Sequence, residues 1–398
     1  MVVAIVTRKN VFLKGPIMFN KFKEFYEKRH DYAKDWKKRT GGKVVGYICT
    51  YTPEEILYAA GVLPVRILGG HQPQSAGISE PYLFGMYCPF CRDCLAQGLQ
   101  GKYEYLDGIV IAQSCIHIRQ TFFTWRQRIP HEFDYYIPMP INVVQPQSSL
   151  PFLRKELEIF KGALENWIGK PISDEDLRRG IEIVNRDRQF MKQVYDLRKR
   201  KDPGLTGLEA MYMVVSSQVT DKREHADSIG KLLKSGLSQR ELGREASIRL
   251  MTVGSENDDV EFVKMVEETL GATIVIEDHC TGSRYFWDEV ELMDKDPLTA
   301  IAERYIGRIP CPTRDWSPNR KRFQKIIEFI EDFGVQGVIL VQQKFCDPHE
   351  IDIPALRDVL NKIGIKNYSL EFDITVPVGQ FRIRVEAFLE TFEAEELF

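Results

Sequence analysis

The chain has 398 residues, of which 43% are apolar and 28% are charged, and its formal net charge is −3. This length predicts two or three domains with enough chain for a large core. The small net charge, with both signs interspersed, argues against the basic proteins that bind nucleic acid, so we expect no nucleic-acid partner. No stretch approaches the roughly eighteen uncharged apolar residues of a membrane span, so we expect no membrane either.

The first residues and the cysteine content indicate the compartment. The apolar run 1–6 is too short for the core of a secretion signal, and basic residues follow it rather than precede it. Eight cysteines are far too few for a disulfide scaffold. We therefore expect a cytoplasmic protein, in which clustered cysteines indicate a metal or catalysis and isolated ones are small buried residues.

The first part of the chain predicts a helix followed by a β-α-β unit. Aromatic residues recur at helical spacing over 17–39, which predicts one amphipathic helix. A buried strand is expected over 43–49 and a second over 62–68. Between them Thr52, as N-cap, and Pro53, in the first turn, are typical of a helix start.

A cysteine-rich segment, Tyr87 to Cys94, follows this unit and places three thiols within seven residues. Pro89 predicts a helix that begins at or just after Cys88. Cys91 lies three residues on and shares a face with Cys88, whereas Cys94 points away from it and stays undecided as a ligand.

The remaining elements alternate in type. Strands are expected over 109–112 and 134–138, helices from 151 to about 245, and then strands over 249–255, 272–276, 337–341 and 368–372 with helices over 258–270, 320–333, 354–363 and after Gly379. Strands that alternate with helices of ten or more residues form mostly parallel sheets. The sequence thus predicts an α/β fold of two related parallel-sheet units, residues 1–150 and 246–398, with a helical insertion at 151–245 and an N-terminal helix.

Two single cysteines help to interpret the cluster. Cys115 and Cys346 each come just after an apolar run that reads as a buried strand, and the carboxyl ends of such strands meet in one crevice. A structural zinc site would need paired cysteine knuckles, and a redox dithiol would stand here without its usual neighbours. Iron–sulfur clusters accept scattered thiolates, so we expect Cys88, Cys115 and Cys346 to hold iron and sulfur, with one iron of a cubane left open for substrate.

Other cysteines and histidines allow two interpretations. Cys280 follows a strand at the rim of the sheet, and Cys311 lies between two prolines that fix its loop. With Cys91 they could hold a second cubane, or they could be plain loop cysteines. His117 and His349 lie near ligand candidates and are candidate proton donors, although each could be a structural histidine.

Two further expectations concern Cys49 and nucleotide binding. Cys49 ends an apolar strand and is expected to be a core residue. No Gly-x₄-Gly-Lys-Ser/Thr or Gly-x-Gly-x₂-Gly stretch occurs, so we expect no ATP or other nucleotide on this chain and place any ATP on another one.

Together these residues resemble the 2-hydroxyacyl-CoA dehydratase and benzoyl-CoA reductase family over nearly the whole chain. The size and the segment Ile309-Pro310-Cys311-Pro312 are most similar to the smaller catalytic subunit of ATP-dependent benzoyl-CoA reductase. The segments that carry the resemblance are Gly46–Glu55, Cys88-Pro89-Phe90 with Arg92, Leu106–Val110, Cys280–Trp287 and Lys344–Glu350.

The resemblance implies a pair of related catalytic subunits, each with an iron–sulfur cluster, that bind a CoA thioester at their junction. A separate ATPase with its own cluster supplies electrons at low potential. Reductases of the family reduce an aromatic ring to a cyclic diene, and dehydratases expel a hydroxyl group. Carried onto this chain, the family ligands fall on Cys88, Cys115 and Cys346.

The chain differs from the simple dehydratase pattern at Cys91 and Cys94, which are additional thiols, and at Asp93. A homodimeric branch of the family, which holds a double cubane, resembles it at Cys88, Cys115, Cys280, Cys311 and Cys346. We therefore expect a [4Fe-4S] catalytic subunit of an ATP-dependent benzoyl-CoA reductase that forms a cyclic dienoyl-CoA. The alternatives are a 2-hydroxyacyl-CoA dehydratase subunit, and a double-cubane reductase or electron-transfer subunit of the same family.

Overall fold

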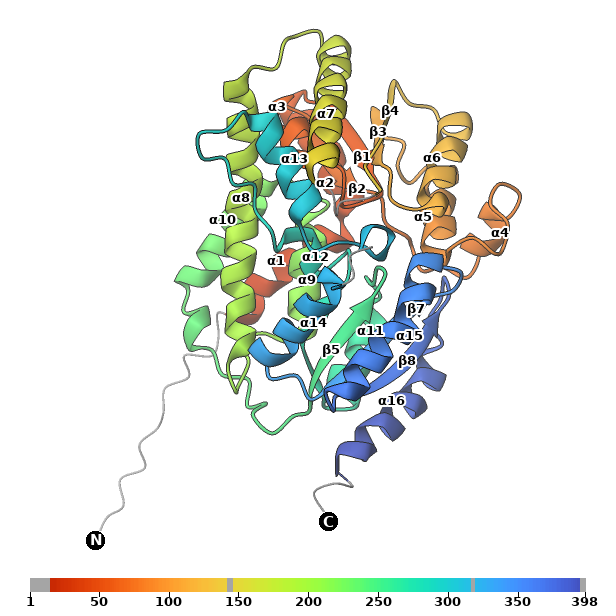
Figure 1. The fold of residues 1–398 in the computed structure, drawn as a ribbon, viewed down its shortest axis with the longest axis vertical. Coiled ribbons are helices and arrows are strands. Elements are labelled where there is room, and N and C mark those ends of the chain that lie inside the picture. The colour runs from red at the N-terminus through yellow and green to blue at the C-terminus, as the bar shows by residue number, and fades with distance from the viewer. Residues whose placement is uncertain (1–14, 142–145, 316–318, 394–398) are drawn as a thin grey trace.

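Two four-stranded sheets form the framework of the protein in a computed structural model that describes residues 15–141, 146–315 and 319–393 (Figure 1). All pairings between neighbouring strands are parallel, as the sequence predicts. The strands are β1 (Val44–Tyr47), β2 (Leu63–Arg66), β3 (Gly108–Ala112) and β4 (Phe133–Ile137) in the first sheet, and β5 (Arg249–Gly254), β6 (Thr273–Asp278), β7 (Gly337–Gln343) and β8 (Lys366–Phe372) in the second.

The two sheets have the same strand order, β2-β1-β3-β4 and β6-β5-β7-β8. In each sheet the second strand lies on one side of the first, and the third strand lies on the other side. The order in which strands are added across the sheet therefore reverses between β1 and β3, and again between β5 and β7, although all the strands stay parallel. In parallel α/β sheets such a reversal opens a crevice at the carboxyl ends of the two strands, where ligands bind.

Helices cover both sheets. Their bounds are α1 (Gly15–Glu27), α2 (Arg29–Thr40), α3 (Glu54–Ala59), α4 (Ser75–Ser79), α5 (Pro89–Leu99), α6 (Ile116–Arg128), α7 (Pro146–Ile168), α8 (Asp174–Asp196), α9 (Gly207–Ser217), α10 (Lys222–Lys234), α11 (Val260–Lys264), α12 (Ser283–Phe286), α13 (Pro297–Gly307), α14 (Lys321–Asp332), α15 (Asp347–Lys362) and α16 (Val378–Glu393). Among the helices of the described residues, none combines the length and the apolar character needed to cross a bilayer.

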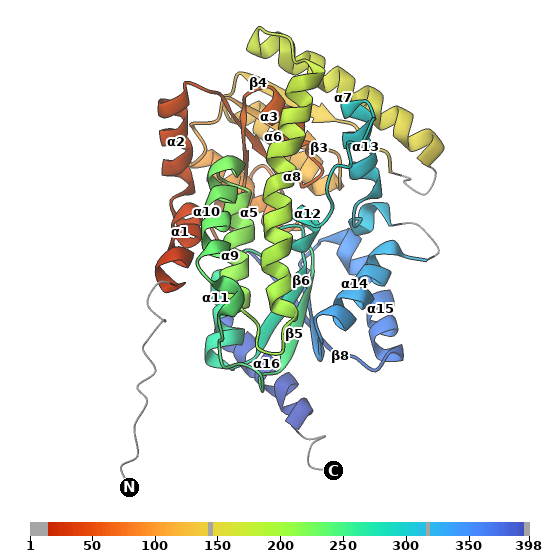
Figure 2. The same cartoon turned by 90° about the vertical axis from the view of Figure 1, so that its left-hand side faces the viewer.

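Helix α8 runs alongside both sheets, as Figure 2 shows. Ser173 and Asp176 form a capping box at its start, which satisfies two backbone N–H groups that would otherwise lack partners. Its buried stripe, which includes Leu177, Ile181 and Val184, packs at helical spacing against neighbours that include α3 and α13. Because α3 belongs to the first unit and α13 to the second half of the chain, this helix joins the two.

Several element bounds differ from the sequence-based expectation. The stretch 17–39 forms two helices that break at Lys28, and the stretch 258–270 is a short α-helix that continues as a π-helix over Met265–Thr269. Helix α3 begins after Pro53, which occupies the cap position expected for Thr52. Helix α15 begins at Asp347 rather than near 354. Pro348 lies in its first turn, where a proline removes only an N–H group that has no intrahelical partner.

Helix α6 was not expected at all. Its buried face consists of Thr121, Phe122 and Trp125, which is too few apolar residues for a clear helical period. Its start at Cys115 nevertheless matters for the site described below.

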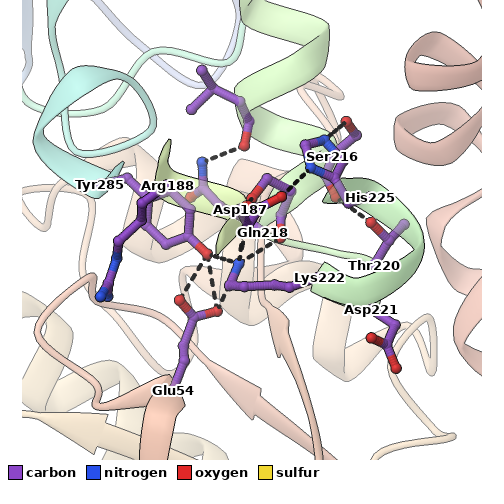
Figure 3. Close-up of polar contacts among 12 residues, drawn as sticks. Glu54, Asp187, Arg188, Ser216, Gln218, Thr220, Asp221, Lys222, His225 and Tyr285 are labelled. Atoms are coloured by element: carbon purple, nitrogen blue, oxygen red, sulfur yellow. Dashed lines mark hydrogen bonds and ion pairs between the residues drawn. The ribbon is translucent and has the colours of Figure 1, made fainter. Parts of the chain in front are cut away.

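A buried polar junction connects the two units through the helices between them (Figure 3). Lys222 is 1% exposed, and its Nζ donates to Ser217 O at 2.8 Å and to the Tyr285 hydroxyl. The same Nζ lies 3.4 Å from Glu54 Oε1 and 4.0 Å from Asp187 Oδ2. The Tyr285 hydroxyl also donates to Glu54 Oε2 at 2.7 Å. One ammonium group therefore balances carboxylates from α3 and α8.

Asp187, His225 and Ser216 lie next to this junction in the spatial arrangement of a hydrolase triad. His225 Nδ1 is 2.6 Å from Asp187 Oδ1, and His225 Nε2 is 3.1 Å from Ser216 Oγ. However, Ser216 and His225 are both 0% exposed, and the Ser216 hydroxyl donates to Met213 O. No substrate can reach this serine, so the arrangement is structural.

Replacement of Lys222 tests the role of the junction. Lys222→Met removes the buried cation that lies 3.4 Å from Glu54, so we expect a loss of about 3–5 kcal/mol in the free energy of unfolding, seen as a lower urea midpoint. The control is Lys155→Met, because Lys155 and its partner Glu158 are 65% and 45% exposed. An exposed pair of this kind contributes about 0–1 kcal/mol. Equal midpoints for the two variants would contradict the assignment.

Candidate functional site

A cavity of about 70 Å³ lies where the carboxyl ends of the two sheets face each other. Its walls come from the residues that follow β1 and β3 of the first sheet and β5, β6 and β7 of the second, together with Arg66 at the end of β2 and the start of α5. The crevices expected at the two reversals of strand order therefore form one common space. Seven of the eight cysteines line it: Cys49, Cys88, Cys91, Cys115, Cys280, Cys311 and Cys346.

The structure places the residues singled out in the sequence as follows. All six candidate cysteine ligands, Cys88, Cys91, Cys115, Cys280, Cys311 and Cys346, line the cavity. The seventh, Cys49, is 7% exposed and packs in a core cluster as expected, but it also borders the cavity. Cys94 lies outside this lining and approaches Ile67 O at 3.5 Å.

The three cysteines expected to bind one cluster share a structural position. Cys88 is the N-cap residue of α5, Cys115 of α6 and Cys346 of α15. The backbone N–H groups at a helix N-terminus and the helix dipole stabilise negative charge, and they favour the thiolate form of a cysteine. At Cys115 the contact is direct, because its Sγ accepts a hydrogen bond from Ile118 N–H at 3.5 Å. Three helices thus direct their positive ends at one cavity.

The thiols interact with each other. Hydrogen bonds from the thiols of Cys346 and Cys91 hold the pKa of Cys88 well below its usual value. Donation to Cys88, together with burial, raises the pKa of Cys346 and Cys91 well above theirs. Burial raises the pKa of Cys115 to about 12. Cys88 is therefore the first of these groups to ionise, and full ionisation of the set requires a positive partner such as a metal.

Three arginine side chains line the other part of the cavity. Arg66, Arg284 and Arg308 are 1%, 2% and 2% exposed. Each has a buried guanidinium nitrogen without a hydrogen-bond partner among the described residues: Arg66 Nε, Arg284 Nη1 and Arg308 Nε. Arg284 Nε lies 3.2 Å from Asp278 Oδ1. Unpartnered N–H groups in a buried guanidinium are costly, so this wall of the cavity suits an anionic group.

The acidic residue of the cavity lining does not cancel this charge. Glu256 is 3% exposed, and burial together with Cys88 and Cys280 raises its pKa well above the usual value. The shift favours its protonated form, and Gln343 Nε2 donates to its Oε1 at 2.8 Å. Basic side chains therefore outnumber acidic ones in the cavity lining.

The two candidate histidines occupy different places. His349 lines the cavity, is 3% exposed, and has no partner for Nδ1 among the described residues. Burial and the charges of Arg322 and Arg284 lower its pKa well below 6.5, so the ring is neutral. His117 is not part of the lining; its Nδ1 accepts from Cys88 N–H at 3.1 Å, and its Nε2 lies 3.8 Å from Asp347.

This donor set fits an iron–sulfur group. Soft thiolates are its usual ligands, and the orphaned guanidinium groups suit the negative charge of the thiolates and sulfides. Within the described residues, no three His, Cys, Asp or Glu side chains converge as they would around a single metal ion. Such convergence is not required of a cluster, because each of its thiolates binds a different iron.

Several residues that line the cavity were not predicted from the sequence. Arg284 lies within the Cys280–Trp287 segment, and Arg66 ends an apolar strand, yet arginines in such positions are more often structural. Cys49 could have been found, because it follows β1 as Cys115 follows β3. Glu256 gave no signal in the sequence.

Comparison with known proteins bears on the identity of this cavity. Residues 49–392 match the family described as 2-hydroxyglutaryl-CoA dehydratase, D-component. The chain is 29% identical over 381 residues to the (R)-phenyllactyl-CoA dehydratase beta subunit of Clostridium sporogenes, covering 94% of this chain and 98% of that one. It is 24% identical over 344 residues to a benzoyl-CoA reductase subunit of Thauera aromatica, covering 85% and 88%.

A third relative matches this chain over a similar length. The (R)-2-hydroxyglutaryl-CoA dehydratase subunit beta of Acidaminococcus fermentans is 24% identical over 366 residues, which cover 89% of this chain and 93% of that one. The match to the family includes every cysteine of the cavity, the whole second sheet, and β2, β3 and β4 of the first. The chain therefore belongs to the 2-hydroxyglutaryl-CoA dehydratase, D-component, family.

Proposed function

We propose that the cavity holds a [4Fe-4S] cluster on Cys88, Cys115 and Cys346, and that the chain is the iron–sulfur catalytic subunit of an ATP-dependent reductase. The observation that carries the proposal is the position of these three cysteines, each the N-cap of a helix that begins at one cavity. When bound, such a cluster supplies single electrons at low potential.

The protein's own groups have four tasks in this proposal. The helix N-termini hold the three thiolates. Arg66, Arg284 and Arg308 balance the negative charge that the thiolates bring into a buried space. The largely apolar lining, much of it buried, limits the access of water, which strengthens these interactions. His349, whose Nδ1 has no hydrogen-bond partner among the described residues, is the candidate donor of a hydrogen bond from within the cavity.

The proposed substrate is benzoyl-CoA, reduced to a cyclic dienoyl-CoA, and the proposed partners are a homologous second subunit and a separate iron–sulfur ATPase. The relatives are named as subunits, which supports a partner of this kind. The alternative of a 2-hydroxyacyl-CoA dehydratase subunit draws support from the 29% identity to a dehydratase subunit, against 24% to the reductase subunit. A cytoplasmic location belongs to the same proposal, because all eight cysteines are free.

A second candidate is a double cubane, and the second group of thiols favours it. Electrostatic interactions link Cys49 to Cys280 and Cys311, and all three line the cavity beside Arg66 and Arg284. A chain with one cubane on Cys88, Cys115 and Cys346 would leave Cys91, Cys280 and Cys311, the cysteines expected to hold a second cubane, without a task. With two clusters, the protein would be a reductase or electron-transfer subunit of the same family.

Iron content tests the cluster. Anaerobically purified protein should contain about four irons per chain for one cubane or about eight for two, with matching acid-labile sulfide. Cys88→Ala, Cys115→Ala and Cys346→Ala should each lose the cluster, because each removes a ligand. Cys94→Ala is the matched control, since Cys94 is buried outside the cavity lining. Zinc without sulfide, or full iron in the three ligand variants, would refute the proposal.

Two other variants separate one cubane from two. With a double cubane, Cys280→Ala and Cys311→Ala should lower iron from about eight to about four per chain, while the visible absorption of the remaining cluster persists. Iron at the wild-type level in both variants would rule out a second cluster on these residues.

The substrate class is tested by turnover with the ATPase partner present. We expect ATP-dependent consumption of benzoyl-CoA and formation of a cyclic dienoyl-CoA, followed by mass spectrometry. A 2-hydroxyacyl-CoA serves as the comparison substrate. Dehydration of this compound without reduction of benzoyl-CoA would instead assign the chain to the dehydratases.

A further inference from the structure

Arg66 makes an unusual set of contacts at one end of the cavity. It is the last residue of β2 in the first sheet, yet it reaches Cys280, which follows β6 of the second. Its Nη2 donates to Cys280 Sγ at 3.1 Å, and its Nη1 donates to Cys280 O at 2.6 Å. One guanidinium group therefore grips both the sulfur and the backbone of the same cysteine.

Gln218 holds Arg66 in this position. Arg66 Nη1 also donates to Gln218 Oε1, and Arg66 N donates to Gln218 O at 2.8 Å. Gln218 Nε2 in turn donates to Thr281 O at 3.2 Å, in the loop that carries Cys280. The residues around the sulfur are thus cross-linked, and the geometry does not depend on a mobile side chain, because Arg66 is 1% exposed.

The two ends of the cavity differ in charge. Arg66 and Arg284 both interact electrostatically with Cys280. The hydrogen-bond partners of Cys88 that lie at the other end are Cys346, Cys91 and His117. Positive side chains therefore gather on the Cys280 side. Hydrogen bonds to a cluster sulfur and nearby positive charge both stabilise the reduced, more negative state of a cluster.

We propose that Arg66 is a positioning residue that holds the Cys280 sulfur as a cluster ligand and raises the reduction potential of the cluster bound there. This inference rests on the second candidate of the proposed function, in which Cys280 binds a cluster, and adds to it a place where an added electron is stabilised. The effect acts through the donor to the ligand, in the way that groups around metal ligands tune many metal sites.

The test compares Arg66→Gln, Arg66→Lys and the wild-type protein in redox titrations followed by electron paramagnetic resonance. Glutamine removes the charge, so the potential should become more negative, with the ratio of reduced to oxidised cluster at a fixed poise falling at least about tenfold, or about 59 mV for one electron. Lysine keeps the charge but loses the two-pronged grip, so its potential should lie between the other two.

Arg249→Gln is the matched control. Arg249 also donates to backbone carbonyl groups, including Phe333 O at 2.9 Å, but it lies at the start of β5, the end of that strand away from the cavity. Its replacement should leave the potential unchanged. A wild-type potential in Arg66→Gln, or an equal shift in Arg249→Gln, overturns the inference.

The iron content of the variants and of the wild-type protein separates failure of this inference from failure of the proposed function. If Arg66→Gln binds no iron, Arg66→Lys decides: a potential below the wild-type value supports the inference, and a wild-type value overturns it. If the wild-type protein itself binds no iron, the proposed function fails and the inference fails with it. Iron in the wild-type protein with unshifted variants overturns the role of Arg66 alone.

Discussion

The site depends on the way two parallel sheets of the same strand order point their carboxyl ends at each other. In a parallel sheet every strand leads to a loop at the same edge, and helices commonly begin at that edge with their positive ends toward it. Because the two edges share one cavity, loops from five strands and the N-termini of α5, α6 and α15 surround it. This arrangement favours negative charge before any particular side chain is considered.

The buried arginines extend this effect and also hold the cavity walls. Arg308 Nη1 donates to Thr50 O at 2.6 Å in the loop after β1. Arg284 Nη2 donates to Ser255 O at 2.9 Å in the loop after β5. Each guanidinium therefore satisfies a carbonyl group of a loop while its residue also lines the cavity. A buried positive charge is tolerated when an opposite charge accompanies it, and ionised cysteines provide that charge.

Much of this could be predicted from the sequence, because it depends on local patterns. Apolar runs separated by helical periods predicted the α/β class, and Cys115 and Cys346 were placed correctly just after β3 and β7. Pro89 predicted the start of α5 at Cys88. The extra thiols Cys280 and Cys311 were recognised as candidates for the same site, and both line the cavity. The rest depends on tertiary contacts that no local pattern encodes. The reach of Arg66 from β2 to Cys280 spans 214 positions in the chain. Helix α6 lacked a strong apolar period, so the N-cap position of Cys115 was not foreseen.

Anomalous diffraction at the iron absorption edge, from crystals grown without oxygen, tests the central claim most directly. The account predicts strong iron density within the cavity, bonded to the sulfur atoms of Cys88, Cys115 and Cys346. Iron density elsewhere in the protein, or a well-ordered cavity without iron in protein shown to be active, would contradict it.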